Sequence, residues 1–303
     1  MPWTNASIVL NSRDATRGTY NNLSFNAEGQ NIIQGQVDSI AVSEVNFPYD
    51  IPNIQSGFNF FTLTNLAPAG PDYDLNIVIA PGFYTGTELE VALNAEILVQ
   101  GTAAGVAAGD LPLITYTDTD NLFAMSSPAA PSAPRFSTWN VQSPATFPSQ
   151  LALVNPLYKD ILSIMGYYTQ QNPFIIAGQP LISGSAPLVF TQYIDICSPQ
   201  LCKFQYFRDG TTTNLARRSD VICRLYIANN VATQEEEGTR PFLIHRQYKN
   251  ARVMRWTADN SVGTIDIQLY DDTGQPLATE WAPRPYQVTF NCYEIGAEEG
   301  LMR

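Results

Sequence analysis

The sequence predicts an all-β protein: a single eight-stranded jelly roll, which is a β-sandwich, with an α/β insertion domain inside it. Two observations carry this prediction. Segments of the C-terminal half alternate between apolar and polar residues with a period of two, as half-buried strands do. Eight strand-like segments flank one stretch of mixed character, and eight is the number of strands in a jelly roll.

The composition agrees with a β-rich fold. Charged residues make up only 15% of the 303 residues, and the chain holds 21 prolines, 19 glycines, 15 phenylalanines and 15 tyrosines. Aromatic residues favour strands, Pro and Gly favour turns, and a weakly charged aromatic surface suits protein contacts.

The expected strands are clearest near the C-terminus. Ile265, Ile267 and Leu269 alternate with polar side chains, and Asp271-Asp272-Thr273-Gly274 then has the composition of a hairpin turn. Glycine accepts positive φ there and aspartate caps the turn. The eight expected strands are residues 20–27, 36–47, 58–65, 187–197, 221–228, 247–256, 264–271 and 286–295.

The middle of the chain differs from a plain sandwich. Thr85 and Glu88 form a capping-box pattern before apolar residues at helical spacing, which predicts a helix that ends near Gly101. A hairpin follows with Asp118-Thr119-Asp120-Asn121 at its tip, and residues 126–148, rich in Pro, Ser and Ala, are expected to form an extended loop.

A second short helix is expected with Asn155 as its N-cap, Pro156 at its first position and Gly166 as its stop. The chain therefore divides into an N-terminal arm, a jelly-roll domain in two segments and an insertion domain. These parts are residues 1–19, residues 20–66 with 181–303, and residues 67–180, respectively.

Charge and hydropathy exclude several function classes. The formal net charge is −12, which repels phosphate backbones, so we expect no nucleic-acid partner. No apolar run reaches the length of a membrane helix, and the N-terminus lacks a signal-peptide pattern, so we expect no membrane insertion and folding in a reducing cytosol. Four cysteines are then expected as packed free thiols: Cys197, Cys202, Cys223 and Cys292.

The sequence offers no pattern for catalysis, a metal or a cofactor, and the protein is not expected to be an enzyme. His245 is the single histidine, so neither a metal site built from several histidines nor a hydrolase triad with a Gly-x-Ser-x-Gly elbow is indicated. The cysteine spacing lacks the tight pairs of a structural zinc site. No particular pair of carboxylates points to glycoside hydrolysis.

Surface contacts are the remaining source of function. Trp3, Trp139 and Trp281 lie in segments rich in proline or polar residues. They are either exposed anchors for a protein contact or plugs at the ends of the sandwich, and the sequence leaves both readings open. Trp139 with Asn140 and Gln142 is the best pattern for stacking on a sugar.

Four blocks of sequence occur in an order that resembles the penton, or minor capsid, proteins of mavirus-like virophages and polinton-like viruses. They are Ser12-Arg13-Asp14 with Gly18-Thr19, Val37 to Pro48, Pro81 to Leu89, and Ile265 to Pro276. The resemblance covers nearly the whole chain and departs from the family in the Pro/Ala-rich segment near residues 126–148.

The resemblance implies a structural role in an icosahedral virion. Five copies of an upright jelly roll would form a homopentamer at each fivefold vertex, with the insertion outward and a double-jelly-roll major capsid protein as neighbour. The protein would be made in the host cytoplasm and located in the virion. The arm, with Ser12, Arg13, Asp14 and Arg17, would tie the ring to neighbouring capsomers.

Two other functions remain open at this point. One is a jelly-roll module that binds a host receptor or glycan, which can coexist with a capsid role, and the other is a jelly-roll glycoside hydrolase. For the arm, we expect deletion of residues 1–19 to spare the fold and to impair incorporation into particles.

Overall fold

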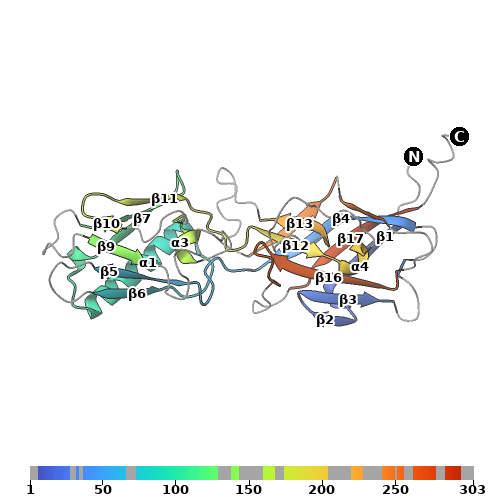
Figure 1. Cartoon of the computed structure of the whole chain (residues 1–303), viewed down its shortest axis with the longest axis horizontal. Coiled ribbons are helices and arrows are strands. Elements are labelled where there is room, and N and C mark those ends of the chain that lie inside the picture. The colour runs from blue at the N-terminus through green and yellow to red at the C-terminus, as the bar shows by residue number, and fades with distance from the viewer. Residues whose placement is uncertain are drawn as a thin grey trace. The chain divides into compact units, whose positions relative to one another are not determined.

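The structure is a computed structural model of the chain (Figure 1). The residues that it describes are 6–27, 32–33, 37–65, 73–128, 138–142, 160–167, 174–203, 220–227, 241–249, 251–255, 262–277 and 284–294.

The chain divides into two compact units. Unit 1 consists of Met1–Asp50, Thr191–Ile227 and Phe242–Arg303, and unit 2 consists of Ile51–Phe190 and Ala228–Pro241. The expected insertion, residues 67–180, falls within the first segment of unit 2, which begins earlier and ends later.

The first sheet of unit 1 is built around one long central strand, β4, with every pairing antiparallel. β17 and then β1 lie on one side of β4 (Figure 1). β14 and β15 pair with successive parts of the other side of β4. The strands are β1 (Ala6–Asn11), β4 (Val37–Tyr49), β14 (Phe242–Gln247), β15 (Val253–Arg255) and β17 (Gln287–Glu294).

The second sheet of unit 1 has the order β13-β12-β16-β3-β2 and is also antiparallel. Ile265, Ile267 and Leu269 of its central strand are fully buried, as their period of two predicts. The strands are β2 (Arg17–Thr19), β3 (Asn22–Asn26), β12 (Tyr193–Cys197), β13 (Val221–Tyr226) and β16 (Thr264–Asp271).

The chain passes back and forth between these two sheets. β1 lies in the first sheet, β2 and β3 in the second, β4 in the first, β12 and β13 in the second, β14 and β15 in the first, β16 in the second and β17 in the first. Such alternation of strands between two facing sheets is the arrangement of a jelly roll. The predicted all-β, jelly-roll-like fold is confirmed.

Two strands do not belong where the sequence placed them. Residues 58–65 were expected in the jelly roll, but β5 (Phe60–Asn65) pairs with strands of unit 2. Residues 1–19 were expected as an arm outside the sandwich, but Ala6–Asn11 is an edge strand that pairs with β17 over its whole length. The alternation of Leu63 and of Leu10 with their neighbours is local, and local alternation does not say which sheet a strand joins.

The expected turn after β16 is confirmed. The Asp271 carboxylate accepts hydrogen bonds from the backbone N–H groups of Thr273 (2.9 Å) and Gln275 (3.0 Å), and Gly274 has a φ of 78°. The aspartate fixes the turn and the glycine takes the conformation that other residues avoid.

Unit 2 combines two antiparallel sheets with one long helix. Its strand orders are β10-β9-β5-β6 and β11-β8-β7. The strands besides β5 are β6 (Asp74–Val78), β7 (Leu113–Thr117), β8 (Leu122–Ser126), β9 (Thr138–Gln142), β10 (Phe174–Ile176) and β11 (Leu181–Ser185). The predicted hairpin with Asp118 and Asp120 at its tip is the connection from β7 to β8.

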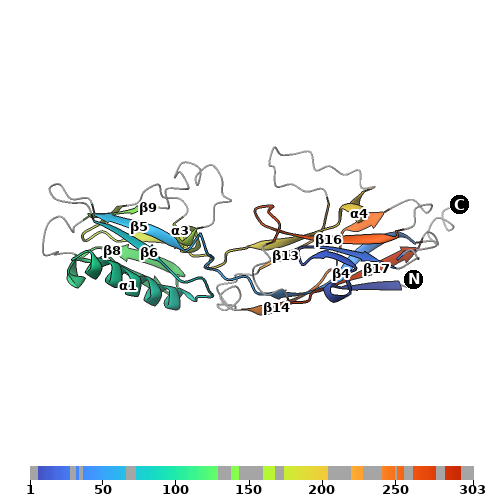
Figure 2. The same ribbon diagram turned by 90° about the horizontal axis from the view of Figure 1, so that it is seen from below.

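Helix α1 (Gly86–Ala103) packs against β6 and β7. Figure 2 shows the helix running alongside β6. Leu89, Leu93 and Ile97 form its buried stripe, as the sequence predicts. At Gly101 a Cβ atom would collide with the side chain of Leu111, so the glycine allows the helix to lie close to the loop before β7. Asn94 fastens the helix to β7, because its amide exchanges hydrogen bonds of 2.7 and 2.9 Å with the backbone of Ile114.

The capping box of α1 is present as predicted. The Thr85 hydroxyl accepts from the Glu88 N–H (3.2 Å), and the Glu88 carboxylate accepts from the Thr85 N–H (2.9 Å). We expect Thr85→Ala to destabilise unit 2 by about 1 kcal/mol, because a helix N–H loses its acceptor. Hydrogen exchange of α1 peptides measures the loss, and Thr87→Ala, at an exposed helix position, is the control. Equal exchange in both variants would contradict the role of the cap.

One local prediction in unit 2 is wrong: the expected loop at residues 126–148 contains β9, which lies between β5 and β10. Helix α3 (Ile161–Ile164) lies within the expected second helix, and its N-cap is Asp160, whose carboxylate accepts from the Ser163 N–H (2.7 Å). The expected N-cap Asn155 and first position Pro156 lie outside the described residues, so the start predicted there stays a prediction. The expected stop is present, because Gly166 follows α3 with a φ of 90°.

Within the described residues, no helix has the length and apolar character needed to cross a bilayer.

Candidate interaction surfaces

The four residues expected to act in an arm lie at a fixed corner of unit 1. Ser12–Asp14 forms a short 3-10 helix after β1, and Ser12 both donates to and accepts from the backbone of Tyr286, each at 2.9 Å. Arg13, Asp14 and Arg17 are exposed. These residues therefore do not belong to an arm outside the sandwich. They lie at its surface, in a segment that connects its two sheets.

Of the three tryptophans that the sequence offers as anchors or plugs, the structure describes Trp139, and Trp139 is not an exposed anchor. Trp139 is fully buried in the core of unit 2, and Asn140 beside it is 8% exposed. The expected sugar-stacking patch at this position is therefore wrong. Trp139 is paired across the sheet with Ile175 and Asn65, which are both fully buried, so its ring lies on the core face of β9 whatever the composition of the flanking loop. Trp3 and Trp281 lie outside the described residues.

His245 has a structural environment on the exposed face of β14. Its Nδ1 atom lies 2.6 Å from Asn46 Oδ1 and 3.4 Å from a carboxylate oxygen of Glu44, both on the neighbouring strand β4. Among the described residues, no serine or cysteine forms a hydrogen bond with the ring. In the part of the chain that the structure describes, no group of three His, Cys, Asp or Glu side chains is arranged to hold a metal ion.

All four cysteines are buried free thiols, as expected. Burial raises the pKa of Cys202 to about 11 and the pKa of Cys223 to about 12. A thiol that stays protonated and enclosed at neutral pH is a packing group.

We expect these thiols to resist alkylation at pH 8 in the folded protein. A pKa two units above the ordinary value lowers the thiolate fraction about a hundredfold, so Cys202 should react about a hundredfold more slowly than in urea. Because the folded-state pKa is raised, the stability gained from the protonated thiols is complete below pH 9 and is lost as the pH rises toward 11 to 12. Rapid labelling of native protein at pH 8, read by mass spectrometry, would show that the thiols are accessible.

A cluster of aromatic and charged side chains lies on the outer face of β12 and β13. Tyr193 is directly opposite Tyr226, and Asp195 is directly opposite Arg224. These four residues are named the tyrosine–arginine patch. Their neighbours in the strands, such as Ile194 and Leu225, are fully buried, so the patch faces away from the core.

The centre of the patch is held rigidly. Arg224 donates two hydrogen bonds to the Asp195 carboxylate, of 2.6 and 2.9 Å, and its guanidinium carbon lies 3.8 Å from the centre of the Tyr193 ring. The hydrogen bond to Asp195 raises the pKa of Arg224 above its ordinary value. Such a bidentate, stacked arginine has one preferred position, and the pair carries no net charge.

Tyr226 is the most prominent member of the patch, with 60% of its surface exposed. Its ring lies 6.0 Å from the Tyr193 ring and 6.0 Å from the Arg224 guanidinium. Tyrosine and arginine are the residue types that contribute most often to the energetic centres of protein interfaces. This patch cannot be recognised in the sequence, because strand pairing brings together residues that are about thirty positions apart.

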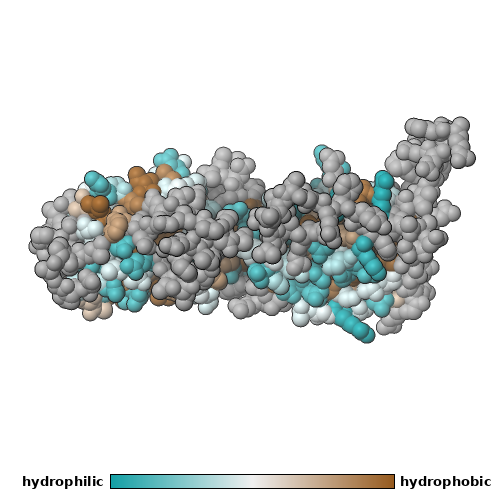
Figure 3. Space-filling model, in the orientation of Figure 1, coloured by the Kyte–Doolittle hydropathy of each residue, from teal (hydrophilic) through white to brown (hydrophobic). Residues whose placement is uncertain are grey.

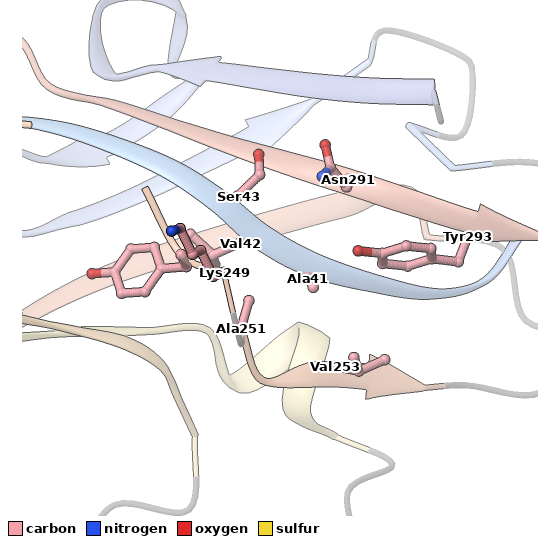
Figure 4. A pocket seen from close by; sticks show the side chains of 9 residues that line it. Ala41, Val42, Ser43, Lys249, Ala251, Val253, Asn291 and Tyr293 are labelled. Atoms are coloured by element: carbon pink, nitrogen blue, oxygen red, sulfur yellow. The ribbon is translucent and has the colours of Figure 1, made fainter. Parts of the chain in front are cut away.

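A hollow lies on the outer face of the first sheet, where β4 carries a bulge. Glu44 pairs with Thr289 and Val42 pairs with Phe290, so Ser43 is the extra residue. On the other side of β4, the chain leaves the sheet between β14 and β15. The space opened there, named the bulge hollow, has a volume of about 390 Å³ (Figure 4).

The bulge hollow is lined by polar side chains and by small apolar ones. Ala41 and Ala251 leave room between the larger polar side chains (Figure 4), which are Tyr248, Lys249, Asn291 and Tyr293. The side chains of Lys249, Asn291 and Tyr293 form no hydrogen bond or ion pair with any residue that the structure describes. A recess that holds several unused polar groups is typical of a binding surface.

Unit 2 carries exposed apolar side chains as well. Leu113, Ile176 and Ile182 are each more than 40% exposed, and apolar residues gather over β7, β10 and β11 in Figure 3. Leu98 of α1 and Leu113 also line a second hollow of about 460 Å³. A weakly charged, partly apolar surface of this kind is suited to contacts with proteins.

Comparison with known proteins gives a match in structure and none in sequence. No protein-family model matches the chain, and no curated protein matches it. The crystal structure of the mavirus penton protein matches 96% of this chain and 100% of its own, with a TM-score of 0.51 and 11% identity. The chain has the fold of that penton protein.

The cryo-EM structure of the Sputnik virophage contains a second similar chain. It matches 98% of this chain and 99% of its own, at 12% identity and a TM-score of 0.45. The likeness to the mavirus penton protein extends over both units, so it includes the insertion in unit 2 as well as the jelly roll in unit 1.

Proposed function

We propose that this protein is a structural capsid protein, the penton at the fivefold vertices of an icosahedral virion. The observation that carries the proposal is the match to the mavirus penton protein over essentially the full length of both chains. A jelly roll alone serves many functions. Here the match also covers the second unit, which interrupts the jelly roll between β4 and β12. This likeness is much more specific than a likeness to a jelly roll alone.

In the proposed role, five copies form a closed ring. Each subunit of such a ring contacts its two neighbours through two different surfaces. Unit 1 offers two distinct surfaces on opposite faces of its sandwich, the tyrosine–arginine patch and the face with the bulge hollow. The low content of charged residues, 15%, limits the charge that must be desolvated when such surfaces meet.

The second proposed partner is a double-jelly-roll major capsid protein, which would surround the ring in the virion. Arg13, Asp14 and Arg17 are exposed at one corner of unit 1 and are proposed to contact this neighbour. Their contribution would be electrostatic and sensitive to salt.

Native mass spectrometry of the purified protein, alone and mixed with the major capsid protein, tests the proposal. We expect a species of five chains, about 167 kDa given a chain mass of 33.4 kDa, in at least one of the two samples. A protein that remains a monomer in both samples would rule out a ring-forming penton.

A further inference from the structure

We propose that the tyrosine–arginine patch of one copy docks into the bulge hollow of the next copy, with Tyr226 as the inserted side chain. This inference rests on the proposed ring, and it names the two surfaces that close it. It is carried by the shape, the unused polar groups and the charge of the two surfaces.

The patch is prepared for docking before any contact forms. Asp195 and Tyr193 fix Arg224 on two sides, by hydrogen bonds of 2.6 and 2.9 Å and by a stacking distance of 3.8 Å. An arginine that is already immobilised loses little conformational entropy on association. Tyr226, exposed over 60% of its surface, stands beside it and offers a ring and a hydroxyl group.

The hollow supplies what an inserted tyrosine needs. Its volume of about 390 Å³ exceeds that of one aromatic side chain, and Ala41 and Ala251 keep it open. Asn291 and Tyr293, whose side chains bond to none of the described residues, can exchange hydrogen bonds with the incoming hydroxyl. Lys249 also lines the hollow and forms no ion pair within the described part of the chain, so its ammonium group can be stabilised by the face of the inserted aromatic ring.

Charge favours this pairing over other contacts between two copies. Each copy carries a net charge of −12, so most surfaces of two copies repel each other. The lining of the hollow contains Lys249 and no Asp or Glu. The Asp195 carboxylate in the patch is neutralised by Arg224. Docking therefore places Lys249 next to the ring of Tyr226 and brings no two carboxylates together.

The positions of the two surfaces suit a small closed ring. They lie on opposite faces of one sandwich, so the contact is head-to-tail and repeats from copy to copy. Tyr248 links them: it lines the hollow, and its hydroxyl donates to the backbone oxygen of Arg224 at 3.0 Å. Both surfaces therefore lie near the same edge of unit 1. In a small ring each subunit is a wedge, and its two contact faces converge toward the axis.

The test blocks one surface at a time. Tyr226→Ala removes the inserted side chain, and Ala251→Trp fills the hollow. We expect each variant to raise the concentration for half-dissociation of the ring by roughly thirtyfold or more, as removal of a central interface residue does. Val91→Ala is the control, because Val91 is 64% exposed on α1 of unit 2 and belongs to neither surface. Circular dichroism of each variant confirms that it is folded.

Mixing the two blocked variants gives the sharper result. The Ala251→Trp copy still has its patch and the Tyr226→Ala copy still has its hollow, so the mixture should form a dimer of one copy of each by native mass spectrometry. Pentamers of wild-type stability in both single variants, or no dimer in the mixture, would overturn the docking while the penton role stands. A wild-type protein that forms no ring, alone or with the major capsid protein, would overturn both.

Discussion

A chain that lacks residues 1–11 is expected to lose on the order of 5 kcal/mol of stability in unit 1, or to aggregate. The deletion removes β1, which pairs with β17 from Ala6 opposite Cys292 to Asn11 opposite Gln287. It also removes Leu10, which is 7% exposed and belongs to the core. β17 would become an edge strand with unpaired backbone groups, which favours association between chains.

Deletion of residues 1–5 is the matched control for this truncation, because it leaves β1 intact. Urea unfolding and hydrogen exchange of β17 peptides compare the two chains. The sequence alone led us to expect that loss of residues 1–19 would spare the fold. If the chain without residues 1–11 folds with unchanged stability, β1 is dispensable, and the expectation that the N-terminal residues can be removed without loss of the fold holds.

The substitution Trp139→Ala should destabilise unit 2 by about 3 to 5 kcal/mol. Trp139 is the largest fully buried side chain in the described part of the chain, and it packs in the core with residues of β5, β8 and α1. Removing the ring leaves a cavity that the two sheets and the helix cannot close without moving. Unit 1 has its own core, so we expect its stability to change little.

Hydrogen exchange resolves the effect by unit, with faster exchange expected in peptides of β5, β9 and α1. Phe174→Ala is the control, because Phe174 lies on the neighbouring strand β10 and is 48% exposed. An exposed aromatic residue should cost about 0.5 kcal/mol or less. Equal destabilisation by the two substitutions would contradict the core position of Trp139.

Local signals in the sequence were sufficient where the structure depends on near neighbours. The capping box at Thr85 and Glu88, the buried stripe of α1 and the turn at Asp271 each involve residues within one or two turns of one another. Physical preferences act over that distance, so these elements are predictable from single segments.

Membership of a sheet was not predictable in the same way. β1 and β5 have similar short alternating patterns, yet β1 completes the jelly roll and β5 belongs to the inserted unit. Only pairing partners far along the chain separate the two cases. For the same reason, β9 was missed: its ladder to β5 joins Trp139 to Asn65, and the flanking Pro and Ala residues indicate a loop.

The candidate surfaces also depend on contacts between distant parts of the chain. The sequence offers Trp139 as a possible contact residue, but in the structure Trp139 belongs to the core. The tyrosine–arginine patch depends on pairing between β12 and β13, and the bulge hollow depends on a register shift at Ser43. Neither arrangement leaves a recognisable spacing in the sequence.

The most direct test of the penton role is a cryo-EM reconstruction of particles that contain this protein. We expect five copies at each fivefold vertex, with unit 1 and unit 2 both fitted in the vertex density. Vertices occupied by another protein, or this chain found elsewhere in the particle, would contradict it.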